Sequence, residues 1–299
     1  MRWSKGVTFL RRMWPRSFDA QKIIGTCSRA SRRQPTRRVS HADIPVIRVH
    51  PWLIVAFSVV AGCSAGSSSP PSGGVTQPTT QGSPVRVLML TATRGFRHDS
   101  ISVAREVMSG LATSTGTFTV TTTEDVASIT SATLSAYDVI FFALTTGELE
   151  FSPDQKNAIV NFVSQGKGFL GVHSATDTLY EWADYGRLVG AYFKEHPWTQ
   201  AATVIVEDAS NPSTSSLGDR FSINEEFYTF RDNPRPRVHV LLRLDAQSVG
   251  ASGDYPLAWT QSFGSGRSYY NALGHFAETW RDARFQRQLA GAIQWAAGR

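Results

Sequence analysis

The chain has 299 residues and a formal net charge of +6. The positive charge is concentrated in residues 1–62, which hold twelve Lys or Arg and two acidic side chains, so residues 63–299 hold 18 basic and 22 acidic ones. The part expected to fold is therefore mildly acidic, and we expect no nucleic-acid partner. The two cysteines, Cys27 and Cys63, precede that part, which excludes a disulfide framework or a catalytic thiol within it.

An apolar segment at residues 52–60 is too short to span a bilayer as a helix but has the length of a signal-peptide core. It leads into Ala61, Gly62 and Cys63, an arrangement that resembles a bacterial lipobox. We therefore expect lipidation at Cys63 and a membrane-anchored lipoprotein on the periplasmic or extracellular face of the cell envelope. The alternative is a short buried helix with a chance cysteine.

Three regions are expected along the chain: a leader over residues 1–62, a tether over 63–84 and a domain over 85–299. The tether is rich in Ser, Gly, Pro and Thr, as flexible linkers are. The Arg-rich residues before Val46 are long for the start of a signal peptide. We hypothesise that Val46 is the true start, read from a GTG codon.

The first half of the domain alternates strands with helices. Apolar and β-branched runs predict strands at residues 85–92, 118–123, 137–144 and 168–172. Helices are predicted over residues 101–111 and 153–165, the second with Pro153 in its first turn and a stop at Gly166. Alternation with short connections predicts a parallel sheet with right-handed crossovers.

The second half has closely spaced strands and hairpin turns, which favour antiparallel additions to the sheet. The expected strands are residues 202–207, 227–230, 238–244, 257–263 and 268–272. An amphipathic helix over residues 281–297 is expected to end the chain.

Four histidines lie at predicted loops or strand ends: His98, His173, His196 and His275. The strand ends of one sheet converge in space, so we expect these side chains to share a site. His173 follows the buried run 168–172, and Asp177 lies four residues later. The two could be a general base and the residue that orients it, or two metal ligands. His98 is a third catalytic candidate.

Substrate-binding candidates surround these positions. Aromatic rings beside charged and imidazole groups are typical of sugar recognition, because the rings stack on CH-rich faces while the polar groups bind hydroxyls. The candidates are Arg97, Trp182, His196, Glu225, Tyr228 and His275. Glu225 and Glu226 would point to opposite sides of an extended strand, so at most one is expected to face a site. No HxH or HxxxH spacing supports a metal site. No cofactor is therefore assigned, and a divalent ion such as zinc stays an open alternative.

Five segments in order resemble the ThuA-like (trehalose utilisation) family over residues 85–297. These are residues 95–101, 168–178, 196–197, 225–228 and 266–275. That family is similar to class I glutamine amidotransferases, which implies a flavodoxin-like three-layer sandwich with a turn after a central strand. His173 then falls at the position of the amidotransferase cysteine, which excludes glutamine hydrolysis through a thioester.

The resemblance implies carbohydrate metabolism, with a disaccharide or a keto-sugar as small-molecule partner. Two hypotheses remain open at this stage. The first is an enzyme that uses His-based acid–base chemistry, and the second is a surface lipoprotein that binds a carbohydrate without turnover.

Overall fold

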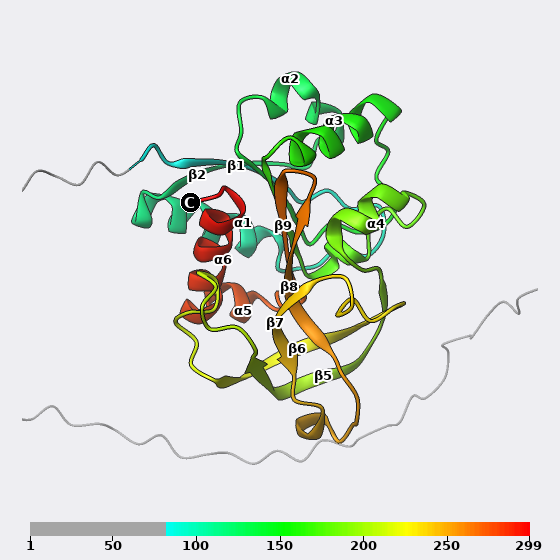
Figure 1. Ribbon diagram of the computed structural model, residues 1–299, viewed down its shortest axis with the longest axis vertical. Helices are drawn as coiled ribbons and strands as arrows, with labels where there is room; N and C mark the ends of the chain where they lie inside the picture. The colour runs from blue at the N-terminus through cyan, green and yellow to red at the C-terminus, as the bar shows by residue number, and fades with distance from the viewer. Residues whose placement is uncertain (1–81) are drawn as a thin grey trace, which may run out of the picture. The chain divides into compact units, whose positions relative to one another are not determined.

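The computed structural model describes residues 82–299 (Figure 1). The leader, the lipidation site at Cys63 and most of the tether lie outside the described residues. No helix within 82–299 combines the length and the apolar character needed to cross a membrane.

Nine strands form one mixed sheet. The strands are β1 (Val85–Leu90), β2 (Phe118–Thr123), β3 (Val139–Ala143), β4 (Gly168–Val172), β5 (Phe193–Val206), β6 (Arg220–Phe230), β7 (His239–Leu244), β8 (Pro256–Phe263) and β9 (Gly266–Asn271). Their order in the sheet is β2-β1-β3-β4-β9-β8-β7-β5-β6. Pairing is parallel from β2 to β9 and antiparallel from β9 to β6. The parallel part has the flavodoxin-like order, so the predicted fold class is confirmed.

Helices cover both faces of the parallel strands. They are α1 (Ile101–Thr115), α2 (Ser131–Leu134), α3 (Pro153–Ser164), α4 (Ala183–Val189), α5 (Ala277–Arg281) and α6 (Ala283–Ala296), with short 3-10 turns η1 (Val126–Ser128), η2 (His173–Thr176) and η3 (Ala246–Val249). Helices α1, α5 and α6 lie on one side of the strands, and α3 and α4 lie on the other (Figure 1). Every residue of β3 and β4 is buried, as expected of strands covered on two faces.

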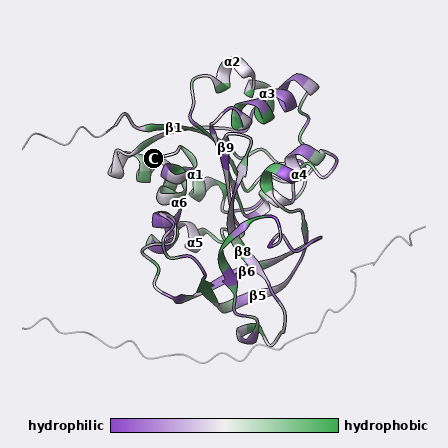
Figure 2. Cartoon of the chain, viewed as in Figure 1, coloured by the Kyte–Doolittle hydropathy of each residue, from purple (hydrophilic) through white to green (hydrophobic). Residues whose placement is uncertain are grey.

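Local signals explain where the helices begin and end. Helix α3 starts with a capping box in which Ser152 and Gln155 exchange hydrogen bonds, and Pro153 occupies its first turn. Polar and apolar residues share this helix (Figure 2), and Ile159 and Val163 on its inner face are fully buried. The last predicted helix, over residues 281–297, corresponds to α6, and the short helix α5 before it was not predicted. Asp282 adopts an extended conformation between the two and caps α6.

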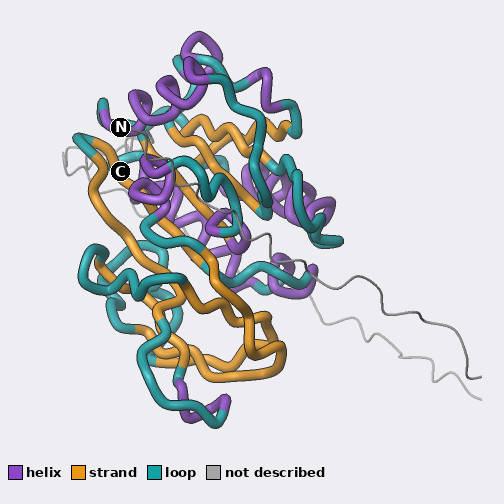
Figure 3. The backbone as a smooth tube through the Cα atoms, turned by 90° about the vertical axis from the view of Figure 1, so that its right-hand side faces the viewer, coloured by secondary structure: helices purple, strands orange, loops and turns teal. Residues whose placement is uncertain are grey.

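The antiparallel part differs most from expectation. Strand β5 begins at Phe193 rather than at residue 202, so His196 lies inside a strand and not in a loop. The pairing of β5 with β6 shifts register between Phe193 and Trp198, which marks β-bulges around His196. The strands of this part extend beyond the helix-flanked part of the sheet (Figure 3). A bulged strand looks like a loop in a sequence because its alternation is interrupted.

Asp138, Arg86 and Lys167 form an ion-pair cluster at the start of the parallel strands. Asp138 accepts hydrogen bonds from the Arg86 side chain at 2.9 Å and from Lys167 at 2.8 Å. These contacts hold the pKa of Asp138 well below its ordinary value of 3.8. Stability from this carboxylate is therefore complete above its unfolded pKa and is lost as the pH falls through the lower folded value.

We expect Asp138→Asn to lower the free energy of unfolding by about 1 kcal/mol at pH 7, since water screens the partly exposed cations. The deficit should shrink below about pH 4, where the unfolded carboxyl takes up a proton. Urea unfolding from pH 7 to pH 3 measures both effects. The exposed Asp219→Asn is the matched control, and an Asp138→Asn deficit that is constant across this range would contradict the prediction.

Candidate functional site

His173 stands at the turn between β4 and η2. Its backbone φ is +52°, in the left-handed region that residues with a Cβ rarely adopt. The turn is tight, since a Cβ on Gly171 would come within 3.2 Å of Ala175. The ring is fully buried, and its Nδ1 lies 2.8 Å from the carbonyl oxygen of Ala272 at the end of β9. A carbonyl only accepts, so Nδ1 donates the proton in this contact, and Nε2 faces the interior of the site.

Two more imidazoles reach the same point from neighbouring strand exits. His98 comes from the loop between β1 and α1 and is 5 % exposed. His275 follows β9 through Gly274, whose φ of +123° is open to glycine and strained for other residues. The Nδ1 of His275 lies 3.3 Å from the Nε2 of His173. The expected convergence of histidines at the strand ends is therefore present.

Glu226 on β6 supplies the carboxylate of the site. Its Oε2 lies 3.1 Å from the Nδ1 of His275 and 3.5 Å from the Nε2 of His173. Its other oxygen, Oε1, lies 3.3 Å from the Nδ1 of the half-exposed His196 on β5. We call His98, His173, His275 and Glu226 the His–Glu centre; one donor atom from each lies within 4.8 Å of the others.

Glu225, predicted as a substrate-binding residue, has a different environment. It is fully buried and accepts hydrogen bonds from the backbone N–H of Gly274 at 3.0 Å and from the Thr279 hydroxyl at 2.6 Å. Its second oxygen accepts from the backbone N–H of His275 at 3.3 Å. Glu225 thus anchors the segment that carries His275, and it is Glu226 that faces the cluster. The sequence alone did not distinguish the two.

Burial and neighbouring charges shift the pKa values of the groups in the centre in different directions. Burial, reinforced by the neighbouring imidazoles, lowers the pKa of His98 to about 3, so this ring is neutral near pH 7. Burial also opposes charge on His275 and Glu226. Hydrogen bonds from His173 and His275 outweigh it at Glu226, and the contact with Glu226 outweighs it at His275. The pKa of His275 is raised and that of Glu226 lies well below its usual range.

Tyr228, predicted as a substrate-binding residue, lies beside the centre. Its hydroxyl lies 3.0 Å from the Nε2 of His173, within hydrogen-bond distance. Burial raises the pKa of Tyr228 far above its ordinary value, so the phenol keeps its proton. Phe193 packs against Tyr228 at 4.3 Å between ring centroids, and Phe96 packs against His98 at 4.8 Å. Phe96 is 64 % exposed, and the sequence pattern did not identify it as a candidate site residue.

Asp177 does not orient His173 as expected. Its Oδ1 accepts a hydrogen bond from the Tyr180 hydroxyl at 2.6 Å, while the Ala272 carbonyl takes the place expected for a carboxylate beside His173. Burial raises the pKa of Asp177 above its ordinary value, although Tyr180 opposes the shift. The reason for the difference is that η2 turns the chain after His173 and carries Asp177 away from the Nδ1 edge.

Two further predicted residues are engaged elsewhere. Arg97 forms a double hydrogen bond with Glu124, at 2.8 and 3.0 Å. Trp182 is 8 % exposed and stacks on Tyr185 at 5.7 Å between centroids, as a residue of the hydrophobic core does. Neither contacts the His–Glu centre through these interactions.

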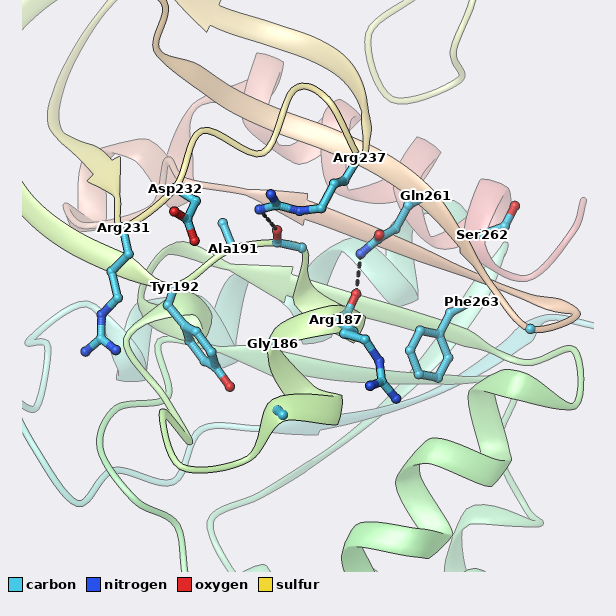
Figure 4. Close-up of a pocket in the computed structure, with 13 residues that line it drawn as sticks. Gly186, Arg187, Ala191, Tyr192, Arg231, Asp232, Arg237, Gln261, Ser262 and Phe263 are labelled. Carbon is cyan, nitrogen blue, oxygen red and sulfur yellow. Dashed lines mark hydrogen bonds between the residues drawn. The ribbon is translucent and has the colours of Figure 1, made fainter.

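A separate cavity of about 560 Å³ lies between α4 and the β8–β9 hairpin (Figure 4). Arg187, Arg231, Arg237 and Gln261 are among its lining residues. Part of this polar surface is already used, because Gln261 donates to the Arg187 carbonyl at 2.9 Å and Arg237 to that of Gly190 at 3.4 Å. None of the predicted site residues line it. The four residues of the His–Glu centre lie outside this cavity.

The donor set of the centre fits a transition-metal ion as well as proton transfer. Three imidazole nitrogens and one carboxylate oxygen are ligands typical of zinc and related divalent ions. Other groups of at least three His, Cys, Asp or Glu that could hold an ion do not occur among the described residues.

The fold and the site define a flavodoxin-like α/β protein with a buried His–Glu centre at the exits of its parallel strands. The family model described as ThuA, trehalose utilisation, matches residues 86–296. The chain belongs to this family, whose description links it to carbohydrate metabolism. The comparison with curated protein sequences gave no match.

Solved structures share the fold. A ThuA-like protein from Bacteroides uniformis superposes with a TM-score of 0.62 at 22 % identity, covering 74 % of this chain and 94 % of its own. One from Parabacteroides merdae has a TM-score of 0.60 at 18 % identity, with 72 % and 90 % covered. A β-galactosidase from Bacillus circulans sp. alkalophilus reaches 0.50 at 14 % identity, over 72 % of this chain and 31 % of its own. At these identities the likeness shows the fold alone.

The anchoring role of Glu225 is testable. Glu225→Gln keeps the shape but puts an amide N–H₂ where the buried carboxylate accepts hydrogen bonds, so at least one donor loses its partner. We expect the free energy of unfolding to fall by about 1–3 kcal/mol in urea titrations. The exposed neighbour Glu278→Gln should change it by less than about 0.5 kcal/mol. Equal effects of the two substitutions would contradict the role.

Proposed function

We propose that this protein acts on a disaccharide or keto-sugar by His-based acid–base chemistry at the His–Glu centre. The observation that supports this most is the inward Nε2 of His173, whose ring is held in position by the Ala272 carbonyl and surrounded by Glu226, His275 and Tyr228. A fixed imidazole beside the His275–Glu226 pair brings together groups that can accept and groups that can donate a proton.

Carbohydrate as the substrate class is supported by family membership and by the aromatic side chains around the centre. Phe96 leaves most of its ring exposed next to His98, and its backbone is fixed by a 2.7 Å hydrogen bond from Thr146 to its carbonyl. A rigid, exposed ring beside polar groups suits the CH face of a sugar, whose hydroxyls then reach the polar groups. Glutamine hydrolysis is not proposed, since no cysteine lies in the described domain.

The alternative is a carbohydrate-binding protein without turnover. The exposed Phe96 favours this alternative as much as the enzyme, because stacking contributes to binding whether or not chemistry follows. The two functions differ in what the loss of His173 does.

Turnover of trehalose, other disaccharides and their 3-keto forms by the purified protein tests the proposal. His173→Asn is the informative variant because asparagine tolerates a positive φ. We expect it to lower turnover at least about 100-fold, the smaller end of what a general base contributes, with sugar binding retained. The exposed His239→Gln is the matched control, since its partner is Asp208 and not the centre.

Each result of this assay supports or rejects one of the two functions. Sugar binding without turnover in the natural protein would support the binding protein instead. A His173→Asn variant as active as His239→Gln would contradict acid–base chemistry at this residue. Neither binding nor turnover of any of these sugars would reject both functions.

We also propose that the protein is a lipoprotein of the cell envelope, anchored to the membrane through Cys63. The apolar segment 52–60, the cysteine that follows it and the Ser/Gly/Pro-rich tether support this. The anchor would leave the domain beginning near Val85 free to meet soluble sugars.

Metabolic labelling with radioactive palmitate in a bacterial host tests the anchor. We expect label and detergent-phase partitioning in the natural chain, and loss of both in Cys63→Ser. Cys27→Ser, which replaces the chain's other cysteine, should keep them. Label that persists in Cys63→Ser, or that is absent from the natural chain, would reject the anchor.

A further inference from the structure

Three imidazole rings meet at one point from three separate strand exits. The ring centroid of His98 lies 4.8 Å from that of His173 and 5.2 Å from that of His275, and the latter two are 5.3 Å apart. The ring planes are steeply inclined to one another, by 83°, 82° and 70°. The rings are therefore not stacked on one another.

The donor atoms have the spacing of a coordination sphere. The Nε2 of His173, the Nδ1 of His275 and the Oε2 of Glu226 form a triangle with sides of 3.1, 3.3 and 3.5 Å. Ligands bound at about 2.1 Å from one ion are separated by about 3.0 Å at octahedral and about 3.4 Å at tetrahedral angles. One nitrogen of His98 completes a set of four within 4.8 Å.

The surrounding protein orients these donors. The Ala272 carbonyl accepts from Nδ1 of His173, which leaves Nε2 as a ligand; such outer hydrogen bonds are usual for metal-binding histidines. The buried Glu225 carboxylate holds the backbone of His275. His98 is 5 % exposed, yet its Nδ1 has no hydrogen-bond partner among the described residues.

A network of hydrogen bonds alone accounts for only part of this arrangement. It explains the contact between His275 and Glu226, where the imidazole donates to the carboxylate. It leaves the buried nitrogen of His98 unsatisfied, although buried polar atoms in folded proteins nearly always have partners. An ion at the common point would replace the proton on the Nδ1 of His275 and bind the three imidazole nitrogens together with Glu226.

We therefore propose that His98, His173, His275 and Glu226 bind one divalent ion of the zinc class. Three imidazoles with one carboxylate suit zinc, cobalt or a similar first-row ion better than magnesium or calcium, which prefer oxygen ligands. The inference rests on the site of the proposed function and reassigns His173 from general base to metal ligand, which leaves the acid–base chemistry to neighbouring groups. A bound ion would polarise a sugar carbonyl or hydroxyl oxygen, a role open to any ion with a free coordination position.

With His173 engaged as a ligand, proton transfer passes to groups beside the ion. His196 contacts the other oxygen of Glu226 and is half-exposed, so it can exchange protons with solvent. The Tyr228 hydroxyl, beside His173, is the second such group. The four ligands and these two neighbours make a site that has both an electrophile and an acid–base pair.

Titration of the chelator-treated, full-length protein with Co²⁺ tests the site without any sugar. We expect one ion per chain, visible d–d absorption bands from nitrogen–oxygen coordination, and displacement by Zn²⁺. Glu226→Gln and His98→Gln should each weaken Co²⁺ binding at least about 100-fold, the upper end of the cost of losing an outer-sphere partner. His239→Gln, outside the centre, should bind as the natural protein does. Thermal melts of the apo proteins identify any variant that fails to fold.

Each outcome either supports or overturns the proposed metal site. Bands that disappear in both centre variants and persist in His239→Gln would support it. Absence of bands in the natural protein, or bands unchanged in folded Glu226→Gln and His98→Gln, would overturn it. Because the titration contains no sugar, its failure leaves the proposed function standing, and an absence of sugar turnover leaves the metal site standing.

Discussion

The contact between His173 and the Ala272 carbonyl is the constraint on which the centre depends. It fixes the tautomer of a fully buried ring and joins the exit of β4 to that of β9. The left-handed backbone at His173 makes this contact possible, because it turns the ring toward the neighbouring strand. Local strain of this kind persists where the surrounding structure enforces it, and it is concentrated at functional sites. The pairing of β4 with β9 supplies that enforcement.

The antiparallel strands contribute as much to the centre as the flavodoxin-like core does. The parallel strands deliver three imidazoles to their carboxyl edge, where open α/β sheets bind ligands. Strand β6, at the far end of the sheet order, returns to the same edge with Glu226 and Tyr228. Without this addition the imidazoles would have no carboxylate partner. The site is therefore a product of two halves of the chain that differ in architecture.

Two adjacent carboxylates illustrate how environment assigns a role. Glu225 accepts hydrogen bonds from backbone N–H groups and a hydroxyl, and it therefore holds the 274–279 segment in position. Glu226 contacts imidazole nitrogens instead, and it therefore supplies the negative charge of the centre. Burial favours the neutral form of a carboxyl group, but the imidazole contacts keep Glu226 ionised. The chemistry of the pair follows from which partners the fold supplies.

The sequence by itself determined the fold class, the parallel strands, and the convergence of His98, His173 and His275, because alternating apolar strands and helices leave few topologies and strand exits share an edge. Only the tertiary structure decided that Glu226 rather than Glu225 faces the cluster and that Asp177 pairs with Tyr180. Those outcomes depend on strand register, on bulges and on the direction of a 3-10 turn. These are properties of long-range packing, which neighbouring residues in a sequence do not specify.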